Sequence, residues 1–293
     1  MNVWTFEAIG TAWQIDTREP LAPDVREAVR DRIEEFDRTW SRFRPDSWVT
    51  QVSQRAGTWT LPDDADALLG LYAQLHDVTG GAVDPLVGQT LADLGYDADY
   101  SLVPTTDEPF VPGGAYSSSL TITFGEPLTR TVTTTQPLLI DVGAAGKGLL
   151  VDKVAGIVGQ ETHQFTVDAG GDMYHGGTTP LRVALEHPLD PTRAIGVAEI
   201  DPEDALCGSA TNRRAWGDGL HHVIDARTGR PTDEVIATWV VAPHSCMHAD
   251  GLATAHFFAA PDALMGVHQH EFVRMYADGR VQWSPDFPGE VFA

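Results

Sequence analysis

Two short blocks of the sequence carry side chains that could do chemistry. One contains His222 and Asp225, and the other, about twenty residues later, contains Asp250 and Thr254. In each block the polar groups lie beside a candidate turn or helix start, which is how sites that move charged groups are usually built. An imidazole, two carboxylates and a hydroxyl in this arrangement predict a site for proton transfer and cation binding.

His222 is the candidate proton acceptor. It precedes Asp225 by three residues, and residues 228–231 form a turn signature. A histidine that is neutral at pH 7 can take a proton from a hydroxyl nucleophile. The alternative is a histidine whose ring is satisfied at the end of a strand. His221 is the weaker candidate, because neighbouring side chains of a strand point to opposite faces.

Asp250 and Thr254 are candidate ligands of a cation. They are four residues apart in a segment, 249–260, whose composition predicts a helix ending before Pro261. That spacing places both oxygens on one helical face, and a carboxylate with a hydroxyl suits a hard cation such as magnesium. The alternative, more common for such a segment alone, is an N-terminal Asp favoured by the helix dipole, with Thr254 bonded to the preceding turn.

Lys147 is one of only two lysines and lies in a glycine-rich run at residues 141–148. Residues 138–140 predict a buried strand before the run, and residues 148–158 predict a helix after it. A glycine-rich turn between a strand and a helix can point backbone amides at an anion. The alternative is a tight packing turn. The pair of glycines in residues 168–172 is more typical of a turn than of a site.

The remaining pattern predicts helices and antiparallel strands. Spaced apolar residues predict helices over 23–40 and 64–79, and alternating or short apolar runs predict further strands. These strands are expected at 120–124, 130–135, 164–167, 181–185, 194–200 and 236–242. The alternation of strands and helices is too irregular for a doubly wound parallel sheet. We therefore expect one α+β domain over residues 1–293, with antiparallel or mixed sheets flanked by helices and a ligand cleft between two lobes.

Composition limits the partners. The formal net charge of −23 over 293 residues disfavours binding to nucleic acid or to an anionic membrane surface. The chain has neither a basic leader nor a segment of membrane-spanning length, so we expect a cytoplasmic protein without membrane insertion, unless a leader has been removed. Cys207 and Cys246 lack metal-ligand spacing and are interpreted as buried thiols.

With these residues assembled, the chain resembles the ApbE family, the FAD:protein FMN transferases, over nearly its whole length. Any single block is weak, but the ordered set is specific. The matching blocks lie, in family order, at residues 8–11 (with Ile9 in place of a methionine), 41–47, 81–88, 141–148, 168–172, 222–231 and 249–254.

The resemblance implies a set of site residues. FAD contacts are implied at Ile9, Phe43, Ala82, Val83, Asp84, Asp141, Lys147 and Ile224. Magnesium is implied at Asp250, Thr254 and the backbone carbonyl of Ala144, with His222 as the catalytic histidine.

The resemblance also implies the reaction, in which FMN is transferred from FAD to a threonine or serine of an acceptor protein and AMP is released. The implied cofactor is Mg²⁺, FAD is the substrate, and the partner is an acceptor flavoprotein. Two alternatives use the same residues: a magnesium-dependent FAD pyrophosphatase that produces FMN and AMP, and a flavin-binding protein without turnover.

Three departures from the family pattern occur. Ala226 replaces a proline, which loosens a turn, and Ala144 replaces a glycine, which matters little if only its carbonyl binds metal. Residues 208–210 read Gly-Ser-Ala where Thr-Ser-Gly is usual. None of them removes a proposed ligand, so we expect an active protein.

Overall fold

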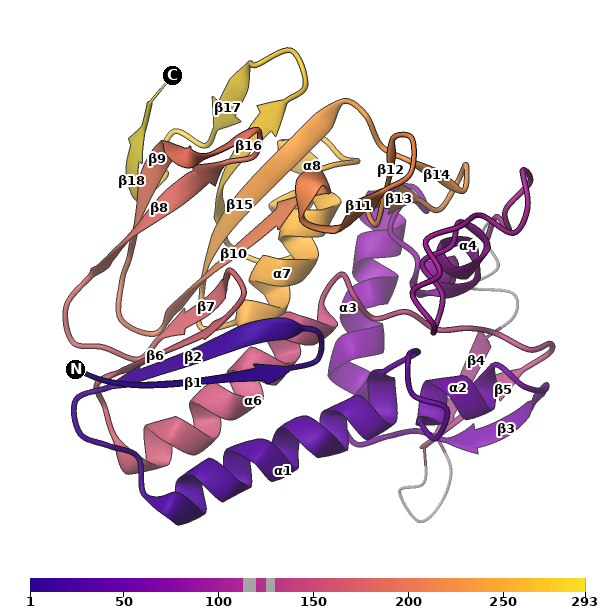
Figure 1. The fold of residues 1–293 in the computed structure, drawn as a ribbon, viewed down its shortest axis with the longest axis horizontal. Helices are drawn as coiled ribbons and strands as arrows, with labels where there is room; N and C mark the ends of the chain where they lie inside the picture. The colour runs from indigo at the N-terminus through magenta and orange to yellow at the C-terminus, as the bar shows by residue number, and fades with distance from the viewer. Residues whose placement is uncertain (113–119, 125–129, 293) are drawn as a thin grey trace. The chain divides into compact units, whose positions relative to one another are not determined.

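The computed structural model describes residues 1–112, 120–124 and 130–292 (Figure 1). The chain folds into two compact units. Unit 1 comprises Met1–Glu35, Ala144–Arg213 and Asp233–Ala293, and unit 2 comprises Phe36–Gly143 and Arg214–Thr232. The expectation of one domain with a ligand cleft between two lobes stays a prediction.

Unit 1 is built on an eight-stranded antiparallel sheet. Its strands, in spatial order, are β1 (Asn2–Ala8), β2 (Thr11–Thr17), β6 (Phe165–Ala169), β7 (Asp172–His175), β10 (Asp204–Ala210), β15 (Val235–Pro243), β16 (Glu271–Tyr276) and β17 (Val281–Trp283). A three-stranded antiparallel sheet has the order β18 (Gly289–Val291), β9 (Asp190–Ile200) and β8 (Leu181–His187). The helices are α6 (Gly146–Glu161), α7 (Cys246–Ala255), the short α8 (Pro261–Leu264) and the 3₁₀ turn η2 (Thr211–Arg214), which crosses into unit 2.

The two faces of the large sheet are covered by different layers. Leu206 of β10 lies in a buried cluster with Leu185 of β8 and Ile200 of β9, so the smaller sheet packs on that face. The next residue, Cys207, points to the opposite face because strand side chains alternate. There its Sγ lies 3.3 Å from Sγ of Cys246 in α7. Both thiols are buried and free, which confirms the interpretation of the cysteines.

Helix α1 (Pro23–Trp40) begins in unit 1 and ends in unit 2. Its proline at the first position and Asp24 in the first turn favour a helix start. Val29, Ile33 and Phe36 are buried on its apolar face, as the sequence predicts. Helix α1 forms with the predicted bounds.

Unit 2 combines short helices with small antiparallel sheets. Its elements are α2 (Trp48–Val52), α3 (Ala65–Val78), the 3₁₀ turn η1 (Pro85–Val87), α4 (Gly88–Asp93), the antiparallel sheet β3 (Gly57–Thr60), β5 (Arg130–Thr134) and β4 (Leu120–Phe124), and two small hairpins, β11 (Ala215–Trp216) with β12 (Leu220–His221) and β13 (Ile224–Asp225) with β14 (Arg230–Pro231). The predicted helix at 64–79 and strands at 120–124 and 130–135 correspond to α3, β4 and β5.

The α+β class with antiparallel sheets is confirmed, and the other predicted strands appear as β6, β8, β9 and β15. None of the helices among the described residues is long and apolar enough to cross a membrane.

One predicted strand is absent. Residues 138–140 are largely buried but form no strand. Asp141 N instead donates to Pro85 O at 2.7 Å. The Leu139 carbonyl lies so close to Gly88 that a Cβ added there would be 2.4 Å from its oxygen. A short apolar run predicts that a segment is buried, but not which backbone it bonds. Here the hydrogen bond goes to a 3₁₀ turn and not to another strand.

The helix predicted over 249–260 has different bounds. It starts at Cys246, after the N-cap Ser245, whose Oγ accepts from His248 N at 3.3 Å, and it ends at Ala255. Asp250 is therefore the fifth residue of α7 rather than an N-terminal one. This placement overturns the alternative in which the helix dipole alone explains Asp250.

Candidate active site

Three ionisable side chains meet inside unit 1. Lys147, the second residue of α6, forms an ion pair with Asp172 Oδ2 at the start of β7. Asp250 of α7 accepts a hydrogen bond from Gly148 N at 2.9 Å through Oδ2. The side chains of Asp172 and Asp250 are buried, and that of Lys147 is 23% exposed. We call Lys147, Asp172 and Asp250 the charged cluster.

The charged cluster has more negative than positive groups. Burial, and then the neighbouring Asp172 carboxylate, raise the pKa of Asp250 well above its usual value. Burial opposes the charged form of Lys147, but Asp172 and Asp250 outweigh it and raise the pKa of Lys147 above its usual value. Within the described residues, Asp172 Oδ1 is buried and has no hydrogen-bond partner. Two buried carboxylates that face one ammonium leave a site suited to a cation.

Glycines bring the elements of the cluster close together. A Cβ added at Gly148 would lie 2.3 Å from the carbonyl oxygen of Cys246 and 2.8 Å from Cβ of Asp250. The start of α6 can therefore approach α7 only with glycine at this position. The glycine-rich run thus acts as a packing turn and also places Lys147 beside Asp172 and Asp250.

The glycine pair before β7 forms a turn, as the sequence predicts. Gly170 and Gly171 have φ of +64° and +101°, and Asp168 Oδ1 accepts from Gly171 N at 2.8 Å. A Cβ at Gly170 would lie 2.1 Å from Thr11 Oγ1. This turn sets the start of β7 and so the position of Asp172. Asp172 closes the block at residues 168–172, whose glycine pair predicts the turn but not the ion pair with Lys147.

The turn between β1 and β2 holds Ile9 in an unusual conformation. Ala8 pairs with Thr11, so Ile9 and Gly10 form a two-residue hairpin loop with φ of +45° and +74°. Loops of this kind strongly favour Asn and Gly. A β-branched residue there is a true outlier, and such strain is often kept at functional positions.

The other proposed magnesium ligands also lie in unit 1. Thr254 follows Asp250 by one turn of α7 and is partly exposed. Ala144 lies in the turn that precedes α6. Thr254 therefore shares α7 with Asp250, and Ala144 precedes Lys147 by three residues.

Unit 2 contains a buried arginine among aromatic rings. Arg42 Nε donates to Asp141 Oδ2 at 2.6 Å, and its Nη1 donates to Tyr96 O at 2.6 Å. Its guanidinium carbon lies 4.2 Å from the ring centroid of Phe43 and 4.6 Å from that of Tyr96. Asp141 Oδ1 also accepts from Gly143 N at 2.7 Å. Asp141 is thus fixed on both oxygens.

Phe43 and Ile224, two of the predicted FAD contacts, belong to one apolar cluster. Ile224 is buried with Leu91, Tyr96 and Trp216, and Phe43 packs on that group with its ring partly exposed. The Tyr96 and Trp216 ring centroids are 5.5 Å apart. We call Phe43, Tyr96, Trp216 and Ile224 the aromatic cluster. Its flat apolar surface suits a ligand with a ring.

His222 follows β12 and is kept neutral by its surroundings. Burial, followed by the charge of Arg214, lowers the pKa of His222 to about 4. Its Nδ1 is buried and forms no hydrogen bond with any described residue. His221, by contrast, uses both ring nitrogens, with Nε2 2.8 Å from Thr232 O and Nδ1 accepting from Val223 N at 3.2 Å. Of the two, His222 is the ring with an atom left for a ligand.

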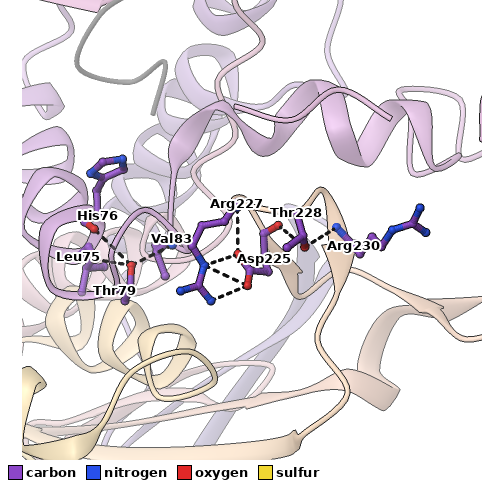
Figure 2. A network of polar contacts seen from close by, with 8 residues as sticks. All are labelled: Leu75, His76, Thr79, Val83, Asp225, Arg227, Thr228 and Arg230. Carbon is purple, nitrogen blue, oxygen red and sulfur yellow. Dashed lines mark hydrogen bonds and ion pairs between the residues drawn. The ribbon is translucent and has the colours of Figure 1, made fainter. Parts of the chain in front are cut away.

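Polar residues of the segment 225–230 hold the β13–β14 hairpin together, as Figure 2 shows. Arg227 folds back on Asp225, with Nη2 2.6 Å from Oδ2 and Nε 2.9 Å from Oδ1. Gly229 N, at a φ of +67°, donates to Asp225 O at 2.8 Å. Asp225 therefore stabilises the turn. Partial burial tends to raise the pKa of Asp225, but the hydrogen bonds and charge of Arg227 outweigh burial and lower it.

The predicted FAD contacts at Ala82, Val83 and Asp84 lie in a tightly bonded loop. Ala82 O accepts from Ala226 N at 3.0 Å. Figure 2 shows the neighbouring bond, in which Val83 N donates to Thr79 Oγ1 at 3.0 Å. The side chains of Ala82 and Val83 are buried.

Asp84 is the polar member of that loop. Its Oδ1 caps η1 by accepting from Leu86 N at 2.8 Å. Its Oδ2 is buried and lacks a hydrogen bond among the residues that the structure describes, and burial raises the pKa of Asp84. Asp84 Oδ2 also lies 3.7 Å from Nε2 of His76, with which it forms an ion-pair contact when that ring is protonated.

The predicted site residues are divided between the units. Unit 1 holds Ile9, Ala144, Lys147, Asp250 and Thr254, and unit 2 holds Phe43, Ala82, Val83, Asp84, Asp141, His222 and Ile224.

Comparison with solved structures places the fold among known ones. In fold, the chain is similar to the crystal structure of the ApbE protein of Thermotoga maritima, with a TM-score of 0.79 at 20% identity over 97% of each chain. It is also similar to the flavin transferase ApbE of Vibrio cholerae, with a TM-score of 0.76 at 24% identity over 98% of this chain and 97% of that one. At these identities the similarity establishes the α+β fold.

Sequence comparison establishes the family. A model of the ApbE family matches residues 9–276. The FAD:protein FMN transferase of Vibrio cholerae serotype O1 is 30% identical over 239 residues, which cover 76% of this chain and 69% of that protein. The FAD:protein FMN transferase of Klebsiella pneumoniae is 25% identical over 305 residues, covering 96% and 87%. The chain belongs to the ApbE family.

Proposed function

We propose that this protein transfers FMN from FAD to a threonine or serine hydroxyl of an acceptor protein, with magnesium as its cofactor and AMP as the second product. The observation that carries the proposal is the charged cluster, in which the buried Asp172 and Asp250 carboxylates face a single ammonium. A pyrophosphate substrate needs positive charge on two phosphates, and the chain's net charge of −23 does not supply it.

The residues of unit 1 fit a magnesium ion. Asp250, Thr254 and the carbonyl of Ala144 would hold it, and the unpartnered Oδ1 of Asp172 adds negative charge beside Asp250. When bound, magnesium neutralises charge on the pyrophosphate. Lys147 contributes a second positive charge, and the raised pKa of its ammonium keeps it protonated at neutral pH.

His222 is the proposed proton acceptor. The acceptor hydroxyl attacks the phosphorus on the flavin side, the bond to the AMP oxygen breaks, and the hydroxyl proton moves to the imidazole. A pKa of about 4 keeps His222 neutral and able to accept, but it makes the ring a weak base. A phosphate bound nearby would raise this pKa, since negative charge favours the imidazolium.

Unit 2 supplies surface for the flavin. Phe43 presents partly exposed apolar surface beside the buried Ile224 in the aromatic cluster, and Asp84 Oδ2, 3.7 Å from Nε2 of His76, has no hydrogen bond to a described residue. These groups bind and orient the substrate rather than react with it.

The decisive experiment uses the purified protein with FAD, magnesium and a candidate acceptor protein encoded beside it. We expect AMP and covalently bound flavin on the acceptor in equal amounts, and neither when a chelator removes the magnesium. Steady AMP release without an acceptor would favour the FAD pyrophosphatase. Tight FAD retention without AMP, even with acceptor, would favour a flavin-binding protein without turnover.

A further inference from the structure

Tyr100 adds a solvent-exposed ring to the aromatic cluster. Its ring stacks on Phe43 with centroids 4.7 Å apart and planes 9° from parallel, and the edge of Tyr96 lies nearby at 5.5 Å. Yet Tyr100 is 49% exposed. It lies outside every sequence block that carries the family resemblance.

Phe43, the predicted flavin contact, is only partly exposed, because two neighbours pack against its ring. Tyr100 stacks on its ring, and the guanidinium carbon of Arg42 lies 4.2 Å from its centroid. Arg42 cannot easily leave, because Asp141 and the carbonyl of Tyr96 hold it and its side chain is 2% exposed. A flat ligand that reaches this cluster therefore meets the open surface of Tyr100.

The loop that carries Tyr100 is held in a strained shape. Tyr100 and Leu102 have φ of +52° and +53°, a region that favours glycine. The Asp97 carboxylate accepts from Ser101 N at 3.0 Å and from Ser101 Oγ at 2.6 Å, and Leu102 N donates to Gly95 O at 2.8 Å. Strain that several hydrogen bonds maintain is typical of a functional position.

We infer that Tyr100 stacks on the isoalloxazine ring of FAD and positions the flavin half of the substrate. The inference rests on the proposed function. A phenol ring is electron-rich and the isoalloxazine is flat and electron-poor, so face-to-face stacking with offset is favourable. The adenine of FAD is the other flat ring that could occupy this surface.

FMN and AMP, the two halves of FAD, serve as separate probes. FMN affinity is measured by quenching of flavin fluorescence, and AMP affinity by calorimetry. Tyr100→Ala should weaken FMN binding about tenfold, because it removes the stacking surface. Tyr100→Phe should bind FMN within about twofold of wild type, since the ring and not the hydroxyl makes the contact. Trp283→Ala, which removes an aromatic residue of unit 1 that is 42% exposed, should change neither affinity.

The outcomes separate this inference from the proposed function. Weaker FMN binding with unchanged AMP binding supports the stacking role. Unchanged FMN binding in Tyr100→Ala overturns it, as does an equal loss for both probes, which would mean that Tyr100 only holds its loop. A loss for AMP alone would assign the surface to adenine. If the wild-type protein transfers flavin while Tyr100→Ala binds FMN normally, the inference fails and the proposed function stands. A wild-type protein that binds neither FAD nor FMN overturns both.

Discussion

In unit 1 the buried charges of Lys147, Asp172 and Asp250 neutralise one another only in part. In unit 2 the buried Arg42 is matched by Asp141 and covered by aromatic rings. His222, also in unit 2, avoids charge altogether through a pKa of about 4. Unit 1 thus buries more carboxylates than ammonium groups, whereas unit 2 buries a paired arginine beside aromatic rings.

Under the proposed function, unit 1 would serve the cation and the pyrophosphate, and unit 2 would serve the flavin and the proton transfer. Buried carboxylates that lie close together are costly unless a cation or proton compensates them. Aromatic rings around an ion-paired arginine carry no such free-energy cost, and they offer contact area to a ligand. Substitutions in unit 1 should therefore alter cation dependence and stability, and substitutions in unit 2 should alter flavin binding or proton transfer.

The largest effect is expected at His222. His222→Ala should lower flavin transfer by about 10²–10⁴-fold, the usual contribution of a proton acceptor, while FAD binding persists. His221→Ala is the matched control and should leave more than about half the activity, because the His221 ring nitrogens are already engaged locally. In-gel flavin fluorescence on the acceptor measures transfer. Equal losses in the two variants, or a loss in His221→Ala alone, would contradict the assignment.

The low pKa of His222 gives this prediction a pH dependence. A proton acceptor works only when neutral, so kcat/KM should fall as pH drops through about 4 and should not change with His222 ionisation above about pH 5. The apparent pKa in kcat should be higher, because bound phosphate favours the imidazolium. An inflection of kcat/KM near the ordinary histidine pKa that disappears in His222→Ala would show that the free ring is not desolvated.

The next largest effect tests the charge excess of unit 1. Asp250→Ala should abolish magnesium-dependent turnover, a loss of about 10²–10³-fold or more for a group that supports charge neutralisation. Thr254→Ala should weaken it less, because a neutral hydroxyl is the weaker ligand. AMP release measured across magnesium concentrations tests both. An Asp250→Ala variant whose magnesium dependence matches that of wild type would refute the site.

Lys147 offers a test of stability rather than activity. Lys147→Ala leaves two buried carboxylates without their ammonium, which should lower the free energy of unfolding by about 3 kcal/mol at neutral pH. The double variant Lys147→Ala/Asp172→Asn removes one carboxylate as well and should recover much of that loss. Urea unfolding with a double-mutant cycle measures the coupling. If the two changes are simply additive, the ion pair does not carry the stability of the cluster.

The sequence predicted local elements of these sites better than the contacts between them. Helix α1 and the turn at residues 168–172 follow from local spacing and glycine, and both formed as predicted. The strand at 138–140 was wrong because its apolar run reports burial and not pairing. The Lys147–Asp172 ion pair could not be predicted, since it joins residues on a helix and a strand whose packing no local pattern encodes.

Ala226 shows the same limit on a smaller scale. From the sequence, this alanine in place of the family's proline only loosens a turn. In the structure its N–H donates to Ala82 O at 3.0 Å and joins the β13–β14 hairpin to the loop of Asp84. A proline at this position could not make that hydrogen bond. The substitution therefore exchanges a stiffer turn for a bond between two predicted flavin-contact segments.

The smallest predicted effect follows from that bond. Ala226→Pro should gain about 0.4–1 kcal/mol from a less flexible unfolded chain. The variant should lose about 1–3 kcal/mol of unfolding free energy, because the carbonyl of the buried Ala82 no longer receives a hydrogen bond from residue 226. We therefore expect a net loss of about 1 kcal/mol in the free energy of unfolding, together with weaker FAD binding. Ala226→Ser keeps the N–H and serves as the control. A more stable Ala226→Pro protein with unchanged FAD affinity would mean that the bond contributes little, and that unit 2 holds its flavin surface through the aromatic cluster alone.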